Sequence, residues 1–183
     1  GNDDDYVDHL AAEVHRETAT EISKFADFFG SRYVADGSGV SANFGLSAAT
    51  GATPDGRKDG ETYADAVLSP MIGRDKNGPT AVLKSASKID PTLYSYLFNQ
   101  RFLPQFLEGQ NKEAFAAYLK TWADLGISHI QFNVVSKDAL LNAQEHPESY
   151  RDLLVRVAGY SAYFVDLSRN LQDLIIARTE QTL

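Results

Sequence analysis

A long segment rich in glycine, proline and aspartate, residues 51–79, constrains the fold of this chain more than any other feature. Its composition is typical of a loop, and compact domains seldom tolerate a loop of this length unless it serves a purpose. Residues 73–80 overlap its end and resemble part of a phosphate-binding loop, but they lack the Gly-Lys-Ser/Thr ending that places an ammonium group on phosphate. We therefore expect the segment to have a purpose other than nucleotide binding.

Hydrophobic periodicity on either side of this loop predicts both helices and strands, and so an α/β protein. Apolar residues recur at helical spacing over residues 7–29, before Gly30, which predicts a long amphipathic helix that packs on another element. Residues 38–46 and 128–135 have the pattern of strands, the second with polar and apolar side chains in alternation. Further helices are expected at 80–89, 112–125 and 139–144, a first turn at Pro147, a strand or mixed segment at 94–101, a strand at 153–157, and a final helix from 168 towards 178.

The acidic N-terminal cluster, from Asn2 to Asp5, has a structural explanation that we favour over a metal site. Carboxylates in the first turn of a helix oppose its dipole favourably and cap free N–H groups. The same segment lacks the basic and apolar regions of a signal peptide, and no run is long and apolar enough to span a bilayer. We therefore expect a soluble cytoplasmic protein.

The overall charge and the residue types limit the ligands and partners. A net charge of -8 and a pI near 4.9 disfavour nucleic acid or an anionic membrane, because either would require a basic face. The absence of cysteine excludes disulfides and thiolate metal ligands from this chain. The histidines, His9, His15, His129 and His146, share no metal-like spacing, so no metal site is assigned.

The segment R-V-A-G-Y-S-A, residues 156–162, is the second distinctive feature, and it follows an apolar run that begins at Leu153. Gly159 in this segment could be only a turn residue. The alternative is that its Cα carries a radical, which would be delocalised into the amide nitrogen and the adjoining carbonyl. Such a radical needs a flattened Cα, and glycine alone allows this without a clash at Cβ.

The segment resembles the C-terminal signature of the glycyl radical enzymes, the superfamily that includes pyruvate formate-lyase, the diol, choline and hydroxyproline lyases, and the arylacetate decarboxylases. The resemblance extends in order from about residue 51 to the end, and it is closer to the lyase, dehydratase and decarboxylase branch than to pyruvate formate-lyase. The motifs that carry it are A-T-P-D-G-R at 52–57, G-E at 60–61, A-D at 64–65 before S-P at 69–70, G-P-T-A at 78–81, S-A-S-K at 85–88, H-I-Q-F-N-V-V at 129–135 and D-L-L-V-R at 152–156.

This resemblance implies an α/β fold that is part of the family's ten-stranded β/α barrel, in which two antiparallel half-sheets are wrapped in helices. Residues 1–127 would form the C-terminal part of the catalytic barrel, and residues 128–183 the glycyl radical domain. The family's catalytic subunits are several times longer than this chain, so the match covers their C-terminal portion. In such enzymes the radical domain is expected to swing out so that an activating enzyme can reach the glycine.

The resemblance also implies cofactors and partners. A radical-SAM activating enzyme, which holds S-adenosylmethionine and an iron–sulfur cluster, would remove a hydrogen from Gly159. The radical would then oxidise a cysteine on an N-terminal portion, because this chain contains none. The resulting thiyl would abstract hydrogen from a small-molecule substrate. An anaerobic bacterium, a cytoplasmic or microcompartment location and a homodimer of the full enzyme are the corresponding expectations.

The resemblance assigns the radical to Gly159 and a supporting role in the loop to Arg156 and Tyr160. Gln131 and Asn133 either orient the backbone near this loop or serve as ordinary cross-strand partners. Arg32 lies where isethionate sulfite-lyases carry a sulfonate-binding arginine, so it is a candidate for binding an anionic substrate. The alternative for Arg32 is complementation of the dipole at the end of the preceding helix.

Three functions from different classes follow from these observations. The first is the radical-bearing part of a lyase that cleaves a C–S, C–N or C–O bond of a small substrate such as isethionate, choline or a diol, with arylacetate decarboxylation as an alternative in the same superfamily. The second is a stand-alone glycyl radical protein that repairs a larger enzyme, although a spare part would need little beyond residues 128–183. The third is a domain without catalysis, in which Gly159 is only a turn.

Overall fold

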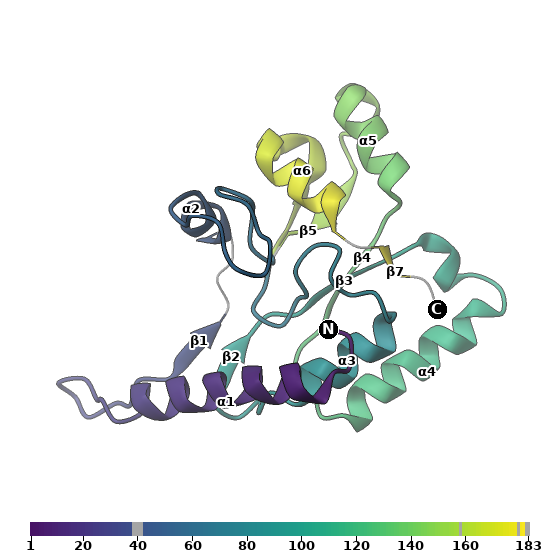
Figure 1. The fold of residues 1–183 in the computed structure, drawn as a ribbon. Coiled ribbons are helices and arrows are strands. Elements are labelled where there is room, and N and C mark those ends of the chain that lie inside the picture. The colour runs from purple at the N-terminus through teal and green to yellow at the C-terminus, as the bar shows by residue number, and fades with distance from the viewer. Residues whose placement is uncertain (38–41, 158, 179, 182–183) are drawn as a thin grey trace.

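The computed structural model of the chain describes residues 1–37, 42–157, 159–178 and 180–181. Its helices are α1 (Asp5–Ile22), α2 (Ala42–Ala48), α3 (Pro79–Ser87), α4 (Asn111–Asp124), α5 (Lys137–Glu145) and α6 (Arg169–Ala177). Its strands are β1 (Ala35–Gly37), β2 (Tyr94–Tyr96), β3 (Asn99–Phe102), β4 (Gln131–Val134), β5 (Leu154–Arg156), β6 (Ser161–Tyr163) and β7 (Glu180–Gln181). Figure 1 shows α1, α3 and α4 at one end of β3 and β4, and α5 and α6 at the other end. The expected α/β class is confirmed.

Strand β3 is the centre of the largest sheet in the described part of the chain. It pairs in parallel with β4 on one edge, where Asn99 lies opposite Gln131, and with β7 on the other, where Arg101 lies opposite Glu180. All four residues of β3 are buried, as expected for a strand covered on both faces. The sheet therefore brings chain segments from before and after the R-V-A-G-Y-S-A segment onto one scaffold.

Two smaller sheets accompany it. Strands β1 and β2 pair in parallel, with Ala35 opposite Tyr94. Strands β5 and β6 form an antiparallel hairpin, with Arg156 opposite Ser161. Most predicted elements are confirmed: α3, α4, α5 and α6 match the expected helices, β4 and β5 match the expected strands, and Pro147 opens a short 3-10 helix, Pro147–Ser149. The mixed segment at 94–101 contains strand β2 and all of β3 except its last residue.

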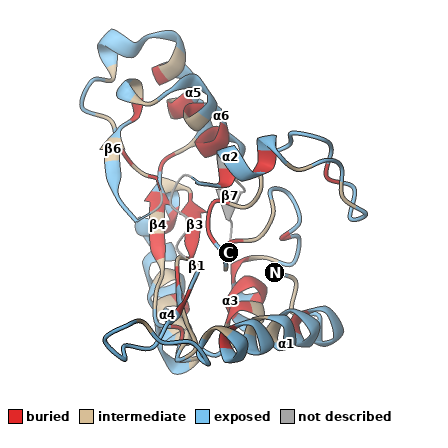
Figure 2. Ribbon diagram, turned by 90° about the vertical axis from the view of Figure 1, so that its left-hand side faces the viewer, coloured by how far each residue is buried: buried red, intermediate tan, exposed pale blue. Residues whose placement is uncertain are grey.

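The buried side chains form two clusters, which Figure 2 shows as red segments along β3, α3, α5 and α6. The first cluster joins α3, β3 and α4 and is centred on aromatic rings, with Phe102 in edge contact with Tyr118 at 5.2 Å between centroids. The second cluster joins β5, α5 and α6 and includes Val155, Leu140 and Ile175. The hairpin of β5 and β6 therefore rests on a core of its own, beside the one that anchors the central sheet.

Two predicted elements were wrong. Helix α1 ends at Ile22 and does not continue to residue 29. The Asp27 carboxylate accepts hydrogen bonds from the Phe29 and Ser31 N–H groups, and such local bonds compete with helix formation. The strand expected at 38–46 is also incorrect where it can be compared, because residues 42–46 belong to α2, whose alanines and leucine favour a helix. Residues 38–41 lie outside the described residues.

Helix α1 begins as the sequence predicts but leaves apolar side chains exposed. The Asp4 carboxylate accepts hydrogen bonds from the Tyr6 and Val7 N–H groups and so acts as the N-cap. The apolar residues of α1 and of the turn after it include several that are more than half exposed: Tyr6, Val7, Leu10, Val14, Phe25, Phe28, Phe29, Tyr33 and Val34. Figure 2 shows α1 largely in the colour of exposed residues. The described helices include none that is both long and apolar enough to cross a membrane.

The long loop between α2 and α3 is confirmed, and it folds around a buried arginine. Arg57 is 3% exposed, and its Nη2 donates to the carbonyls of Thr50 and Gly51 at 3.0 and 2.6 Å. Its Nη1 donates to the carbonyl of Glu61 at 2.5 Å, and its guanidinium lies 4.6 Å from the ring centroid of Tyr63. A single side chain therefore satisfies backbone groups that no helix or sheet could reach.

Candidate active site

Gly159 occupies the tip of the hairpin formed by β5 and β6. The N–H of Val157 donates to the carbonyl of Tyr160 at 2.9 Å, which closes the turn. Gly159 has φ +77°, a conformation that costs other residues roughly 1–2 kcal/mol. An added Cβ would meet only Leu97 Cδ1, at 3.6 Å, so the backbone conformation and not a lack of space selects glycine here. Ala158 lies outside the described residues.

Gln131 of strand β4 holds the tip of the hairpin through its side-chain oxygen. Oε1 accepts a hydrogen bond from the N–H of Gly159 at 3.2 Å and another from Nε of Arg156 at 2.8 Å. Gln131 is 8% exposed, so water competes little for these bonds. The amide nitrogen of Gly159, onto which a Cα radical would delocalise, is therefore fixed by a buried acceptor.

Asn133, two residues further along β4, fixes the strand that leads to this tip. Its Nδ2 donates to the carbonyl of Arg156 at 2.6 Å, and its Oδ1 accepts from the N–H of Arg156 at 2.7 Å. The side-chain amide thus replaces a backbone partner and ties β5 to β4. Gln131 and Asn133 point to the same face because they are two positions apart in a strand. Of the two roles considered for these amides, the orientation of backbone near Gly159 is the one that these contacts describe.

His129 lies beside this group of side chains. Its Nδ1 accepts from the N–H of Phe98 at 3.1 Å, and its Nε2 lies 2.9 Å from Nε2 of Gln131. Burial, followed by the charge of Arg156, lowers the pKa of His129. Because Nδ1 is the acceptor, a neutral imidazole carries its hydrogen on Nε2, which faces the NH2 group of Gln131, so the 2.9 Å contact joins two donors and does not hold the Gln131 amide.

Arg178 is a functional candidate that the sequence did not indicate. It is the C-cap of α6 and is nine-tenths buried. Its Nη1 donates to the carbonyl of Arg156 at 3.0 Å, its Nη2 donates to the carbonyl of Val157 at 2.6 Å, and its Nε lies 2.6 Å from Oδ2 of Asp65. Burial lowers the pKa of Arg178, and the charge of Asp65 opposes this change. No periodicity or motif of α6 signalled this role, because its partners are distant in sequence.

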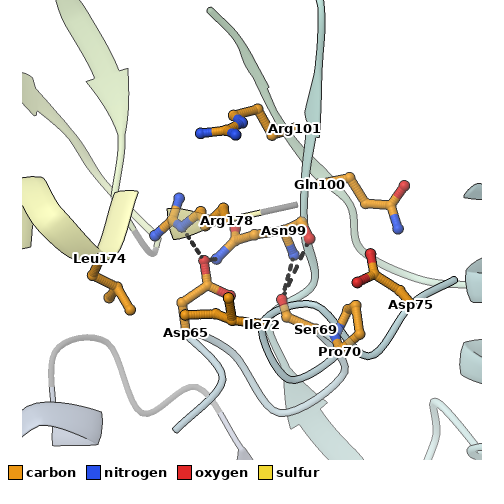
Figure 3. A pocket seen from close by; sticks show the side chains of 10 residues that line it. All are labelled: Asp65, Ser69, Pro70, Ile72, Asp75, Asn99, Gln100, Arg101, Leu174 and Arg178. Carbon is orange, nitrogen blue, oxygen red and sulfur yellow. Dashed lines mark hydrogen bonds and ion pairs between the residues drawn. The ribbon is translucent and has the colours of Figure 1, made fainter. Parts of the chain in front are cut away.

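The ion pair of Arg178 and Asp65 borders a small polar cavity of about 30 Å³, shown in Figure 3. Asp65 also accepts a hydrogen bond from Nδ2 of Asn99 at 3.1 Å, and Ser69 Oγ accepts from the N–H of Asn99 at 2.9 Å. The A-D and S-P motifs of the long loop are therefore anchored on β3. The cavity is lined by Asp65, Ser69, Pro70, Ile72, Asp75, Asn99, Gln100, Arg101, Leu174 and Arg178.

Of the site residues expected from sequence, Gly159 and Arg156 meet on the side chain of Gln131, and Arg156 Nη1 also donates to Ser161 Oγ at 3.2 Å. Tyr160 forms the turn through its backbone carbonyl, while its side chain is 39% exposed. Arg32 is exposed in the turn between α1 and β1, and none of the hydrogen bonds around Gly159 described above involves it. Helix α1 ends ten positions earlier, so Arg32 lies outside its last turn, and an antiparallel bridge pairs Arg32 with Ala26.

Comparison with known proteins places this hairpin in a known family. The profile described as "Glycine radical" matches residues 64–165, more than half of the chain. The protein is 40% identical to indoleacetate decarboxylase of Tractidigestivibacter scatoligenes, over 98% of this chain and 21% of that protein. It is 42% identical to isethionate sulfite-lyase of Bilophila wadsworthia, over 98% of this chain and 22% of that protein.

A solved structure gives the same result. The B12-independent glycerol dehydratase of Clostridium butyricum, in its glycerol-bound form, superposes with a TM-score of 0.94 at 42% identity, over 100% of this chain and 24% of that chain. The protein therefore belongs to the glycine radical family, and its fold is that of the pyruvate formate-lyase-like enzymes. The chain spans about a fifth to a quarter of the length of these relatives.

Proposed function

We propose that this chain is the radical-bearing part of a lyase, and that Gly159 is the residue on which the radical is stored. The observation that carries the proposal is the hairpin tip within the matched family region, where the Gly159 N–H is held by the buried Gln131 oxygen. Arg156 supports the loop through the same oxygen and through Ser161, and Tyr160 supports it through the turn.

Activation at Gly159 would break one Cα–H bond homolytically. One electron stays on Cα, and the hydrogen atom passes to an organic radical that an activating enzyme generates from S-adenosylmethionine with an electron from its iron–sulfur cluster. In turnover the glycyl radical takes a hydrogen atom from a cysteine thiol, which re-forms Cα–H and leaves a thiyl radical. The thiyl then takes hydrogen from the substrate. The chain's own contribution is to fix the glycine amide through Gln131. Gly159 is exposed in this structure, so the N-terminal portion would have to supply the cover that keeps oxygen and solvent from the radical.

The cysteine would come from an N-terminal portion of the same enzyme. In this chain, residues 1–127 would complete the barrel of that enzyme, and residues 128–183 would form the radical domain. The exposed apolar side chains of α1 and of the turn that follows support such a partner, because exposed patches of this kind mark interaction surfaces. The two clusters of buried residues support a division of the chain, although the first cluster also packs Ile130 and Phe132, beyond the proposed boundary, and the second begins at Val135. A cytoplasmic location in an anaerobic bacterium and a homodimeric full enzyme belong to the same proposal.

The reaction is proposed as cleavage of a C–S, C–N or C–O bond of a small substrate. The relatives named above are a decarboxylase, a sulfite-lyase and a dehydratase at 40%, 42% and 42% identity, so overall similarity does not choose among these chemistries. Arg32 is proposed to bind an anionic substrate, because it is exposed and a guanidinium fork suits an oxyanion. Unchanged substrate affinity in Arg32→Ala would contradict that role.

Anaerobic electron paramagnetic resonance after incubation with a radical-SAM activating enzyme tests the proposal. We expect a doublet in the wild-type protein, because the one hydrogen left on Cα splits the signal, and no doublet in Gly159→Ala. Gly126→Ala is the matched control: Gly126 also has positive φ, +69°, and open space at Cβ, so alanine there adds the same backbone strain away from the site.

The outcomes separate the alternatives. A doublet in the wild type and in Gly126→Ala, but not in Gly159→Ala, assigns the radical to Gly159. Absence of any signal in a folded sample, with the cysteine-bearing portion present, would leave Gly159 as a turn residue. If this chain restores activity to a larger enzyme whose backbone has been cleaved at its own radical glycine, the repair function would be established instead.

A further inference from the structure

Arg178 joins three parts of the protein that are far apart in sequence. Its guanidinium contacts the carbonyls of Arg156 and Val157, the two described residues directly before the hairpin tip. The same side chain contacts the carboxylate of Asp65, in the long loop. Asp65 is held in turn by Asn99 of β3, as Figure 3 shows. A single cation therefore bridges the radical hairpin and the barrel scaffold.

The position of Arg178 is itself fixed by β3. Arg101, 3% exposed, donates from Nη1 to the carbonyls of Ile175 and Ile176 at 3.0 and 3.1 Å. These carbonyls lie in the last turn of α6, where the helix dipole favours a cation and the backbone oxygens lack helical partners. Arg101 thus anchors the end of α6 on the central sheet, and Arg178 follows directly at the C-cap.

The hairpin could leave this contact in two ways, which differ in what happens to the ion pair. The side chains of Arg178 and Asp65 are 10% and 7% exposed, so either charge left alone in the closed protein would be costly. If the hairpin and the end of α6 move away together, both charges reach water. If the hairpin alone moves, Arg178 loses two carbonyl partners while its charge stays paired. Opening in which the end of α6 moves with the hairpin therefore breaks the Arg178 ion pair, whereas opening of the hairpin alone breaks only the two carbonyl contacts.

We propose that Arg178 and Asp65 form a clasp that sets how often the radical hairpin leaves the barrel. Arg178 is a positioning residue, since it contacts the carbonyls before Gly159 and not the glycine itself. Gly159 is exposed in this structure although the clasp is closed, so the clasp does not itself bury the Cα. A closed clasp keeps the hairpin against β4, where the N-terminal portion would cover the glycine, and an open clasp releases it to the activating enzyme. The link to radical installation rests on the proposed function, whereas the effect on hairpin opening does not.

The first measurement is hydrogen–deuterium exchange of this chain together with the N-terminal portion of the enzyme, before the radical is installed. It compares the wild type with Arg178→Gln, Asp65→Asn and the double variant. The reporters are the N–H groups of Val157 and Gly159, which exchange in proportion to the open fraction. We expect exchange to rise on the order of 100-fold in each single variant, the change that loss of one partner of a buried ion pair brings. The double variant should exchange less than the sum of the single effects predicts, because neither charge is left alone.

Arg169→Gln is the matched control. Arg169 lies on the same helix and pairs with Asp173, but its side chain is 66% exposed, so its loss should leave exchange unchanged. Amide exchange in α4 serves as the internal reference, because faster exchange there as well would indicate global unfolding.

The second measurement is the rate of radical installation, which should rise in the single variants by up to the same factor if the activating enzyme takes only the open state. Hairpin exchange that is unchanged in both single variants, or that rises only together with exchange in α4, would overturn the clasp. Faster hairpin exchange with no radical in any sample, wild type included, would keep the clasp as a hold on the hairpin and would overturn the proposed function instead.

Discussion

Replacement of Gln131 by methionine tests the central contact of the site. Methionine has nearly the same length and keeps the apolar contacts of the stem, but it offers no comparable hydrogen-bond acceptor. The change removes the acceptor shared by the Gly159 N–H at 3.2 Å and the Arg156 Nε at 2.8 Å. Because the residue is 8% exposed, water cannot readily take over either bond.

The expected cost follows from these two bonds. A neutral hydrogen bond contributes about 0.5–1.5 kcal/mol and one to a charged group about 1.5–3 kcal/mol, so Gln131→Met should lower the free energy of unfolding by about 2–4 kcal/mol. The hairpin should also loosen before the rest of the protein, since both bonds end on residues of the hairpin and its tip.

Urea unfolding gives the free energy, and amide exchange at Gly159 gives the local opening. Gln110→Met is the control, because Gln110 is exposed and makes no side-chain cap bond at the start of α4. If Gln131→Met changes the free energy of unfolding by less than about 0.5 kcal/mol, as a surface substitution would, the Gln131 oxygen does not hold the hairpin tip.

Two further predictions concern pH and the long loop. Burial lowers the pKa of His15 and His129 below the ordinary 6.5, and the charge of Arg156 lowers that of His129 further. Just below pH 6.5 the unfolded chain therefore binds more protons than the folded protein. The free energy of unfolding should fall as the pH drops through 6.5. His129→Gln should flatten this dependence in urea midpoints compared between pH 7.5 and pH 5.5, and an equally steep dependence would contradict it. Arg57→Lys should lower the free energy of unfolding by about 2–3 kcal/mol, because an ammonium cannot span the carbonyls that the guanidinium fork reaches. Thermal denaturation measures this loss of stability, with Arg16→Lys as the control. Arg16 forms an exposed ion pair on α1, so its replacement should have little effect. Equal losses of stability in the two variants would contradict the role of Arg57.

Local patterns in the sequence were sufficient where neighbours along the chain supply the interactions. The 3.6-residue period predicted α3, α4, α5 and α6, and alternation predicted β4, because each pattern states directly which face is buried. The Asp4 cap was predictable for the same reason, since an N-cap bonds only to the next few residues. The prediction failed where local side-chain bonds competed with a period, as Asp27 does after α1. It also failed where a short segment of mixed apolar and polar residues fitted both a strand and a helix, as it does in α2.

The motif that contains Gly159 could likewise be recognised in the sequence, and it indicated the family to which the chain belongs. The acceptor for the Gly159 N–H, the lowered pKa of His129 and the ion pair of Arg178 with Asp65 were decided by the tertiary structure alone. These contacts depend on β3 lying between β4 and β7 and on α6 ending against β3, which brings distant charges and amides together in a buried space. Sequence patterns report the face that a residue turns to the core, whereas the partner that it meets there is set by how the elements pack.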